Sequence, residues 1–181
     1  RCTTNSDPTL VNVLISDNTA TQEGGGVFCY NSDPSFINVT ISGNVSSIND
    51  GGGIFIKNNS NMNLLNTVLW SNESNEIEFS SVDNSSTITL SYSNIEGGQD
   101  GIVINDNGTV TWGDGNIDVD PRFIDSENSN YHLLASSMLI NAGHPDSTDS
   151  DGTRADIGAY PYLTDNTEPV WYINTAGNDI E

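Results

Sequence analysis

Apolar and polar positions recur in the same order along the first half of the chain. Residues 5–18 read NSDPTLVNVLISDN and residues 31–44 read NSDPSFINVTISGN, an offset of 26 residues. A looser third copy covers residues 64–72, and a fourth covers residues 88–98. β-Branched residues are dense in these copies, and no window shows the apolar spacing of about 3.6 residues that marks a helix. The pattern predicts short strands arranged in a repeated unit.

Each of the first two copies continues through a variable loop into three glycines and an apolar strand. Gly24–Gly26 precede VF, and Gly51–Gly53 precede IFI. One such unit cannot bury its own apolar side chains, whereas stacking brings matching positions of successive units together at about 4.8 Å. We therefore expect inward side chains to form continuous columns. One column would hold Leu10, Phe36 and Leu64, and another Ile15, Ile41 and Leu69.

Asparagines hold the same phase in three copies, at two places in the unit. The first set is Asn12, Asn38 and Asn66, and the second is Asn18, Asn44 and Asn72. Stacked asparagines can exchange amide hydrogen bonds with the copies above and below, which avoids a cost of about 1–3 kcal/mol for each unsatisfied buried polar group. The shared phase favours two structural ladders over the alternative, in which each asparagine is an independent turn residue.

These repeats and several later segments resemble known sequences. The order NVxISxN, then GGG and two apolar residues, resembles the right-handed parallel β-helix repeats of secreted and surface bacterial proteins in the pectate-lyase-like superfamily. The segments GNIDVDPRF (115–123), YHLL (131–134), INAG (140–143) and DGTRADIGAY (151–160) resemble an end module that recurs in such proteins. The resemblance covers about residues 5–162. It implies an all-β fold: a right-handed parallel β-helix (solenoid) with short strands, Asn ladders and a loop-rich C-terminal end module.

The same resemblance divides the chain into four parts. Residues 1–98 are expected to form β-helix coils, the first of them cut in mid-coil, and residues 99–162 the last coils and the end module. The composition then changes, so residues 163–169 are interpreted as a linker. Residues 170–181 resemble the first strand of a further module. That strand would pack on the end of a β-helix, its own or a neighbour's, or stay an unpaired tail.

The charge of the chain restricts its partners. The 181 residues include 25 acidic and 4 basic side chains, for a net charge of -21. Such a surface repels nucleic acid and anionic membranes and attracts divalent cations. No apolar run approaches the roughly 20 residues that span a bilayer. We therefore expect no nucleic acid partner, no membrane insertion, and an extracellular or cell-surface location.

Catalytic residue sets of the resembling enzymes are not recognisable in this sequence. A pectate-lyase-like site needs an acidic calcium cluster beside a cationic base. Lys57 has no acidic cluster at a repeated phase and is expected to be a solvated surface lysine, while Arg122 and Arg154 are expected to pair with nearby aspartates. A polygalacturonase-like site needs a histidine flanked by glycines, and neither His132 nor His144 is so flanked. We therefore predict no catalytic residues.

The strongest candidate site is the acidic loop of residues 146–156, in which oxygen side chains alternate before a glycine. Alternate residues of a tight loop point at one centre, as calcium loops require. Asp149, Asp151 and Asp156 are the predicted metal ligands, with calcium as the cofactor. The bidentate acid expected six residues after the glycine is absent, and Asp156 would take its place. The alternative is an acidic turn with Arg154 as its counterion.

Cys2 and Cys29 are the only cysteines, and they fall close to the same phase of the repeat. We expect them in adjacent coils. Two interpretations stay open at this point: a disulfide bond between the coils, or stacked free thiols that act as small hydrophobic side chains.

Three functions are compatible with these observations. The first is a non-catalytic extracellular scaffold, adhesin or surface module that contacts polysaccharide along a strand-built face. The second is a fragment of a carbohydrate-active enzyme, of polysaccharide lyase or glycoside hydrolase type, with its active site elsewhere. The third is a self-assembling extracellular filament subunit, whose partners are copies of itself or adjacent modules. The lack of a recognisable catalytic set favours the first.

Overall fold

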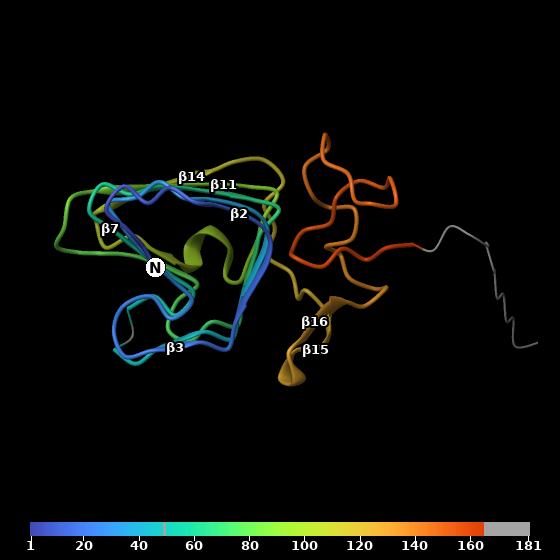
Figure 1. The fold of residues 1–181 in the computed structure, drawn as a ribbon, viewed down its shortest axis with the longest axis horizontal. Helices are drawn as coiled ribbons and strands as arrows, with labels where there is room; N and C mark the ends of the chain where they lie inside the picture. Colours follow the sequence, from blue (N-terminus) through green and yellow to red (C-terminus); the bar gives the residue numbers. More distant parts are fainter. Residues whose placement is uncertain (49, 165–181) are drawn as a thin grey trace, which may run out of the picture.

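A computed structural model describes residues 1–48 and 50–164, which form a parallel β-solenoid with a loop-rich module on its flank (Figure 1). One sheet stacks β1 (Cys2–Thr3), β4 (Val27–Tyr30), β7 (Ile54–Lys57), β10 (Ile77–Phe79) and β13 (Ile102–Val103). A second contains β2 (Thr9–Ser16), β5 (Ser35–Ser42), β8 (Asn61–Leu65), β9 (Val68–Trp70), β11 (Ser86–Ser91), β12 (Asn94–Ile95) and β14 (Gly108–Trp112). The predicted all-β parallel β-helix is confirmed.

The shorter elements complete the coils and the module. β3 (Thr19–Ala20) pairs with β6 (Val45–Ser46) at a third side of the solenoid. A short 3-10 helix, η1 (Gly98–Gly101), precedes β13. In the module, β15 (Phe123–Asp125) and β16 (Asn130–Leu133) form an antiparallel hairpin joined by the 3-10 helix η2 (Ser126–Asn128). None of the described helices is long and apolar enough to cross a membrane.

The second sheet is bent along a row of asparagines. Asn12, Asn38 and Asn66 have φ angles of 55°, 52° and 50°, in the left-handed region that asparagine tolerates better than most residues. Each turns the chain from one side of the solenoid to the next. The first half of β5 therefore pairs with β8, and its second half pairs with β9.

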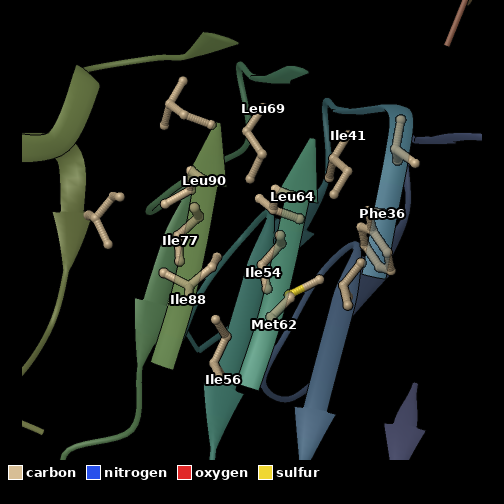
Figure 2. Close-up of a cluster of buried hydrophobic side chains, with 14 of the residues drawn as sticks. Phe36, Ile41, Ile54, Ile56, Met62, Leu64, Leu69, Ile77, Ile88 and Leu90 are labelled. Atoms are coloured by element: carbon tan, nitrogen blue, oxygen red, sulfur yellow. The ribbon is translucent and has the colours of Figure 1, made fainter. Parts of the chain in front are cut away.

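Inward side chains form the two predicted columns. Leu10 is in register with Phe36, which is in register with Leu64, and the series Ile15, Ile41 and Leu69 is aligned in the same way. Phe36 and Ile41 are 1% and 0% exposed. Figure 2 shows Phe36, Ile41, Leu64 and Leu69 in the interior between the strands. Each fully buried side chain of this size contributes about 1.5–3 kcal/mol, and inward residues of the first sheet, such as Ile54 and Ile77, complete the same core.

The glycine triplets lie where successive coils approach each other most closely. A Cβ on Gly52 would lie 1.7 Å from the carbonyl oxygen of Glu73, and Gly51 has a φ of 60°. The backbone N–H groups of Gly25 and Gly26 donate to the carbonyls of Gly51 and Gly52 at 3.0 and 2.9 Å. The triplets therefore serve tight coil stacking, for which a side chain leaves no room.

The module packs against the side of the solenoid (Figure 1). Val68 of β9 forms a second apolar cluster with Leu133, Leu139 and Ile157 of the module. The backbone N–H of Gly158 donates to the carbonyl of Asn66 at 2.9 Å. The module thus covers the β9 side and leaves the side formed by β8, β11 and β14 open. The predicted strand at 170–181 and most of the predicted linker lie outside the described residues.

Candidate functional site

The first asparagine set connects the coils to the module. Asn38 Nδ2 donates to Asn12 Oδ1 at 3.1 Å, and Asn66 Nδ2 donates to Asn38 Oδ1 at 2.9 Å. The remaining oxygen, Asn66 Oδ1, accepts the backbone N–H of His144 at 2.7 Å. The row along the bend therefore ends in a hydrogen bond that fixes a loop of the module.

The second asparagine set is the more deeply buried. Asn44 and Asn72 are 0% and 8% exposed. Asn18 Nδ2 donates to Asn44 Oδ1, and Asn44 Nδ2 donates to Asn72 Oδ1, both at 2.9 Å. The row ends on Glu76, whose carboxylate accepts both the backbone N–H and the side-chain amide of Asn72. Each buried amide thus has a partner in the next coil.

Glu76 is a buried carboxyl group that sequence reasoning missed, because it lies in a loop outside the repeat phase. It is 5% exposed. Burial raises its pKa to about 8, hydrogen bonds from Asn72 oppose that rise, and the neighbouring Glu96 adds to it. Glu96 in turn accepts the backbone N–H of Ser71 at 2.7 Å. Two acidic side chains, Glu76 and Glu96, therefore lie near each other at one corner of the solenoid.

A groove of about 540 Å³ runs between the solenoid and the module. We call it the junction groove. Its solenoid wall is built from residues at the ends of β2, β5 and β9, namely Asp17, Ser42, Gly43, Trp70 and Ser71. Its module wall contains Asp120, Arg122, Phe123, Ser126, Glu127, Tyr131 and Leu134. An indole ring, a guanidinium group and several carboxylates therefore face one open space.

The floor of the junction groove is held by a contact between its two walls. Tyr131 Oη lies 3.2 Å from both carboxylate oxygens of Asp17 and donates to them. Burial and the charge of Asp17 raise the pKa of Tyr131. Phe123 packs edge-on against the Tyr131 ring at 5.1 Å. The groove is thus a fixed feature, since both walls are pinned to each other.

The expected ion pairs of Arg122 and Arg154 are wrong. Arg122 donates to Ser136 Oγ at 3.2 Å, and its guanidinium otherwise faces the groove. Arg154 donates through Nε to the carbonyl of Gly143 at 2.6 Å and lies over the ring of Tyr92. Over residues 1–48 and 50–164, neither arginine forms a salt bridge with an aspartate. The hydroxyl of Ser136 takes the place of the predicted counterion of Arg122, and backbone carbonyls of the module take that of Arg154.

The expectation that Lys57 is a solvated surface lysine is also wrong. Lys57 Nζ lies 2.9 Å from Glu23 Oε1 and 3.4 Å from Asp83 Oδ2, and its side chain is 17% exposed. It also lies over the stacked rings of Phe28 and Phe55. The two acidic partners come from loops of different coils, so the repeat phase carried no sign of them.

The three predicted calcium ligands bind backbone groups of the module. Asp156 accepts the N–H groups of Asn141 and Tyr162, both at 2.6 Å, and Asp149 accepts the N–H of Asp156 at 3.0 Å. Asp151 accepts the N–H and hydroxyl of Thr153, which lower its pKa. Burial raises the pKa of Asp149 and of Asp156. In the described part of the chain no three acidic, His or Cys side chains are grouped for metal binding, and calcium stays a prediction.

Cys2 and Cys29 are neighbours in register on β1 and β4. Both are buried free thiols. Cys29 Sγ donates to the carbonyl of Ser32 at 3.3 Å, and burial raises the pKa of its thiol to about 11. The pair occupies an apolar column of the core as small side chains.

Residues 3–133 match the family model described as a right handed beta helix region, and the chain belongs to this family. The match includes all the coils and ends within the module, at the last residue of β16. No curated protein and no solved structure matches the chain. The family defines the fold and its handedness, and the ligand has to be argued from the surfaces of this chain.

Proposed function

We propose that this protein is a non-catalytic extracellular β-helix module, of the adhesin or surface type, that binds a neutral polysaccharide in the junction groove. The observation that carries the proposal is the convergence of Trp70, Arg122 and the carboxylates of Asp17 and Asp120 on one groove of about 540 Å³. A sugar ring offers an apolar face to an indole and hydroxyl groups to charged planar side chains. Pockets that combine a few such groups are the usual binding sites of small polar ligands.

The charge of the groove favours a neutral sugar over a uronate. Asp17, Asp120 and Glu127 line it together with a single cation, Arg122. Carboxylates accept hydrogen bonds from sugar hydroxyls and repel an anionic polymer, and the net charge of -21 adds to that repulsion. The same proposal places the chain in the pectate-lyase-like superfamily and identifies residues 115–160 as its end module, because the motifs of that segment resemble it.

Binding to an array of neutral and uronic acid oligosaccharides tests the proposal. We expect binding of neutral glycans that Trp70→Ala weakens about tenfold or more. Arg122→Gln is the second variant, since that side chain is exposed and its loss spares the packing of Trp70. Tyr30→Ala removes an aromatic side chain from a strand outside the groove and is the matched control. Retained binding in both groove variants contradicts the assignment of the site.

A second assay addresses catalysis. The purified chain is incubated with the glycan that it binds, and new reducing ends and unsaturated products are followed. A non-catalytic module releases neither. Turnover that Arg122→Gln abolishes would replace the proposal with that of a carbohydrate-active enzyme.

A further inference from the structure

One side of the solenoid carries a regular array of small polar side chains. The outward residues at one level of β2, β5, β8, β11 and β14 are register partners from coil to coil: Thr9, Ser35, Asn63, Thr89 and Thr111. Two residues before them on the last three strands lies a second row, Asn61, Thr87 and Thr109. We call these two rows the hydroxyl face.

The side chains of the first row point away from the protein. Four of its five members are exposed, and Ser35 is half-buried. Over residues 1–48 and 50–164 none of the five makes a side-chain hydrogen bond, so their hydroxyl and amide groups face solvent. In the second row Thr87 Oγ1 donates to Asn61 Oδ1 at 2.8 Å. The alternate residues of the same strands, Phe36, Leu64 and Leu90, are core side chains that hold the face rigid.

The hydroxyl face repeats in two directions. Neighbouring strands lie about 4.8 Å apart, and alternate residues along a strand about 6.6 Å apart. Extended sheets normally twist, and stacked side-chain ladders are one means of keeping them flat. In Figure 1 the strands β2, β11 and β14 overlap along the upper side of the solenoid. The result is an open, flat, two-dimensional lattice.

The hydroxyl face is uncharged in a protein whose net charge is -21. None of its eight residues is charged, and a third row beside them begins with the apolar residues Val11, Ile37 and Leu65. Charge enters where the second row continues into the first two coils: Asp33 accepts hydrogen bonds from the backbone and amide of Asn61, and Asp7 accepts one from the backbone N–H of Asp33. Charge complementarity therefore points to an uncharged partner for this face.

We propose that the hydroxyl face binds the surface of an ice crystal. An ice surface is a flat, uncharged lattice of hydrogen-bonding oxygens, and its repeat along the a-axis lies within a few tenths of an ångström of the spacing between strands. Water molecules ordered on rows of hydroxyl and amide groups would join the crystal with little further loss of entropy. Charged side chains would instead keep hydration shells of their own.

A neutral polysaccharide is the other uncharged partner, and the face suits it less well. No aromatic side chain lies in either row, and only Thr109, at the end of the second row, borders a hollow. A single sugar chain would also use only one direction of a lattice that repeats in two. The junction groove, which lies on a different side, offers the aromatic ring and the concave shape that a sugar chain needs.

The test measures thermal hysteresis, ice-crystal shaping and inhibition of ice recrystallisation with the full 181-residue chain. We expect all three activities, and a loss of about tenfold or more in Thr89→Tyr, which places a bulky ring at the centre of the face. Thr21→Tyr makes the same change at an exposed loop and is the matched control. Circular dichroism melting verifies that both variants fold.

Several outcomes overturn the inference. A folded wild-type chain without any effect on ice does so, as does Thr89→Tyr with undiminished activity. Glycan binding that is lost in Thr89→Tyr, without an effect on ice, would identify the face as a polysaccharide surface instead. Arg122→Gln separates the two proposals, because it is expected to weaken glycan binding in the groove and to leave ice binding unchanged.

Discussion

The hydroxyl of Tyr131 in the module lies 3.2 Å from each carboxylate oxygen of Asp17, which precedes it by 114 residues in the first coil. Ser129 adds a second contact to the same carboxylate at 3.3 Å. The module therefore contacts the solenoid both at Asp17, which directly follows β2, and at β9. The contact at Asp17 joins the two walls of the junction groove.

Removing that hydroxyl is expected to loosen the module. Tyr131→Phe deletes a partly buried hydrogen bond to a charged group, and we expect a loss of about 1–2 kcal/mol in the free energy of unfolding. Urea denaturation followed by circular dichroism measures it, and Tyr30→Phe is the control for the loss of a phenol hydroxyl. If the two variants have equal stability, the contact does not hold the module.

In the second asparagine row, the buried Asn44 is expected to contribute more to the free energy of unfolding than the exposed Asn18. Asn44→Ala removes the hydrogen bonds that Asn44 Nδ2 donates to the carbonyl of Ile15 and to Asn72 Oδ1 in the core, and leaves Asn72 Oδ1 with the backbone N–H of residue 44 alone. We expect a loss of about 2–4 kcal/mol, against about 1 kcal/mol or less for Asn18→Ala, whose side chain is exposed. Thermal and urea unfolding of both variants compares the two sites. Equal losses would contradict a ladder whose stability comes from buried amides.

The sequence predicted well the features that recur in every coil, such as the core columns. The columns that contain Leu10 and Ile15 follow from the phase alone, because parallel stacking places equal phases above one another. Lys57 shows where this reasoning ends: its partners come from variable loops of other coils, at positions that no repeat relates. The junction groove could not be predicted from the sequence for a related reason. Its walls meet through long-range contacts such as Asp17 with Tyr131, which no local pattern encodes.

Calcium binding at the acidic loop stays open to a direct test. The prediction from the sequence is that calcium binds Asp149, Asp151 and Asp156 and raises the melting temperature. Chelator should then lower it, and Asp151→Asn should remove the difference. Asp151 also accepts hydrogen bonds from Thr164, so this variant is compared with the wild type in chelator. No heat of binding in calorimetry, together with a melting temperature that chelator leaves unchanged, would refute the prediction.

The two core thiols are expected to react slowly in the folded protein. Cys2 and Cys29 are buried, and burial raises the pKa of both thiols, that of Cys29 to about 11. Only the thiolate is nucleophilic, so alkylation at pH 8 should be at least about tenfold slower than in urea. Mass spectrometry after iodoacetamide treatment measures the rates. A mass two hydrogens lower, with no alkylation even in urea, would instead reveal a disulfide between the two coils.

Glu76 should make the stability of the protein depend on pH in a particular direction. Its pKa is about 8 in the folded chain and 4.5 in the unfolded chain, so the folded state binds the extra proton between these values. The contribution of Glu76 is therefore fully present below about pH 4.5 and is lost as the pH rises through about 8. Other carboxylates titrate as well, and a variant is needed to isolate this one.

Glu76→Gln supplies that comparison, because an amide keeps the size of the side chain and cannot ionise. Its oxygen still accepts a hydrogen bond from Asn72. The difference in unfolding free energy between variant and wild type should shift in favour of the variant by roughly 2–4 kcal/mol between pH 5 and pH 9. Glu73→Gln, an exposed neighbour in the same loop, should show almost no shift. A pH-independent difference for Glu76→Gln would mean that the carboxyl group is ionised in the folded protein, with Glu96 and the end of the asparagine ladder accommodating its charge.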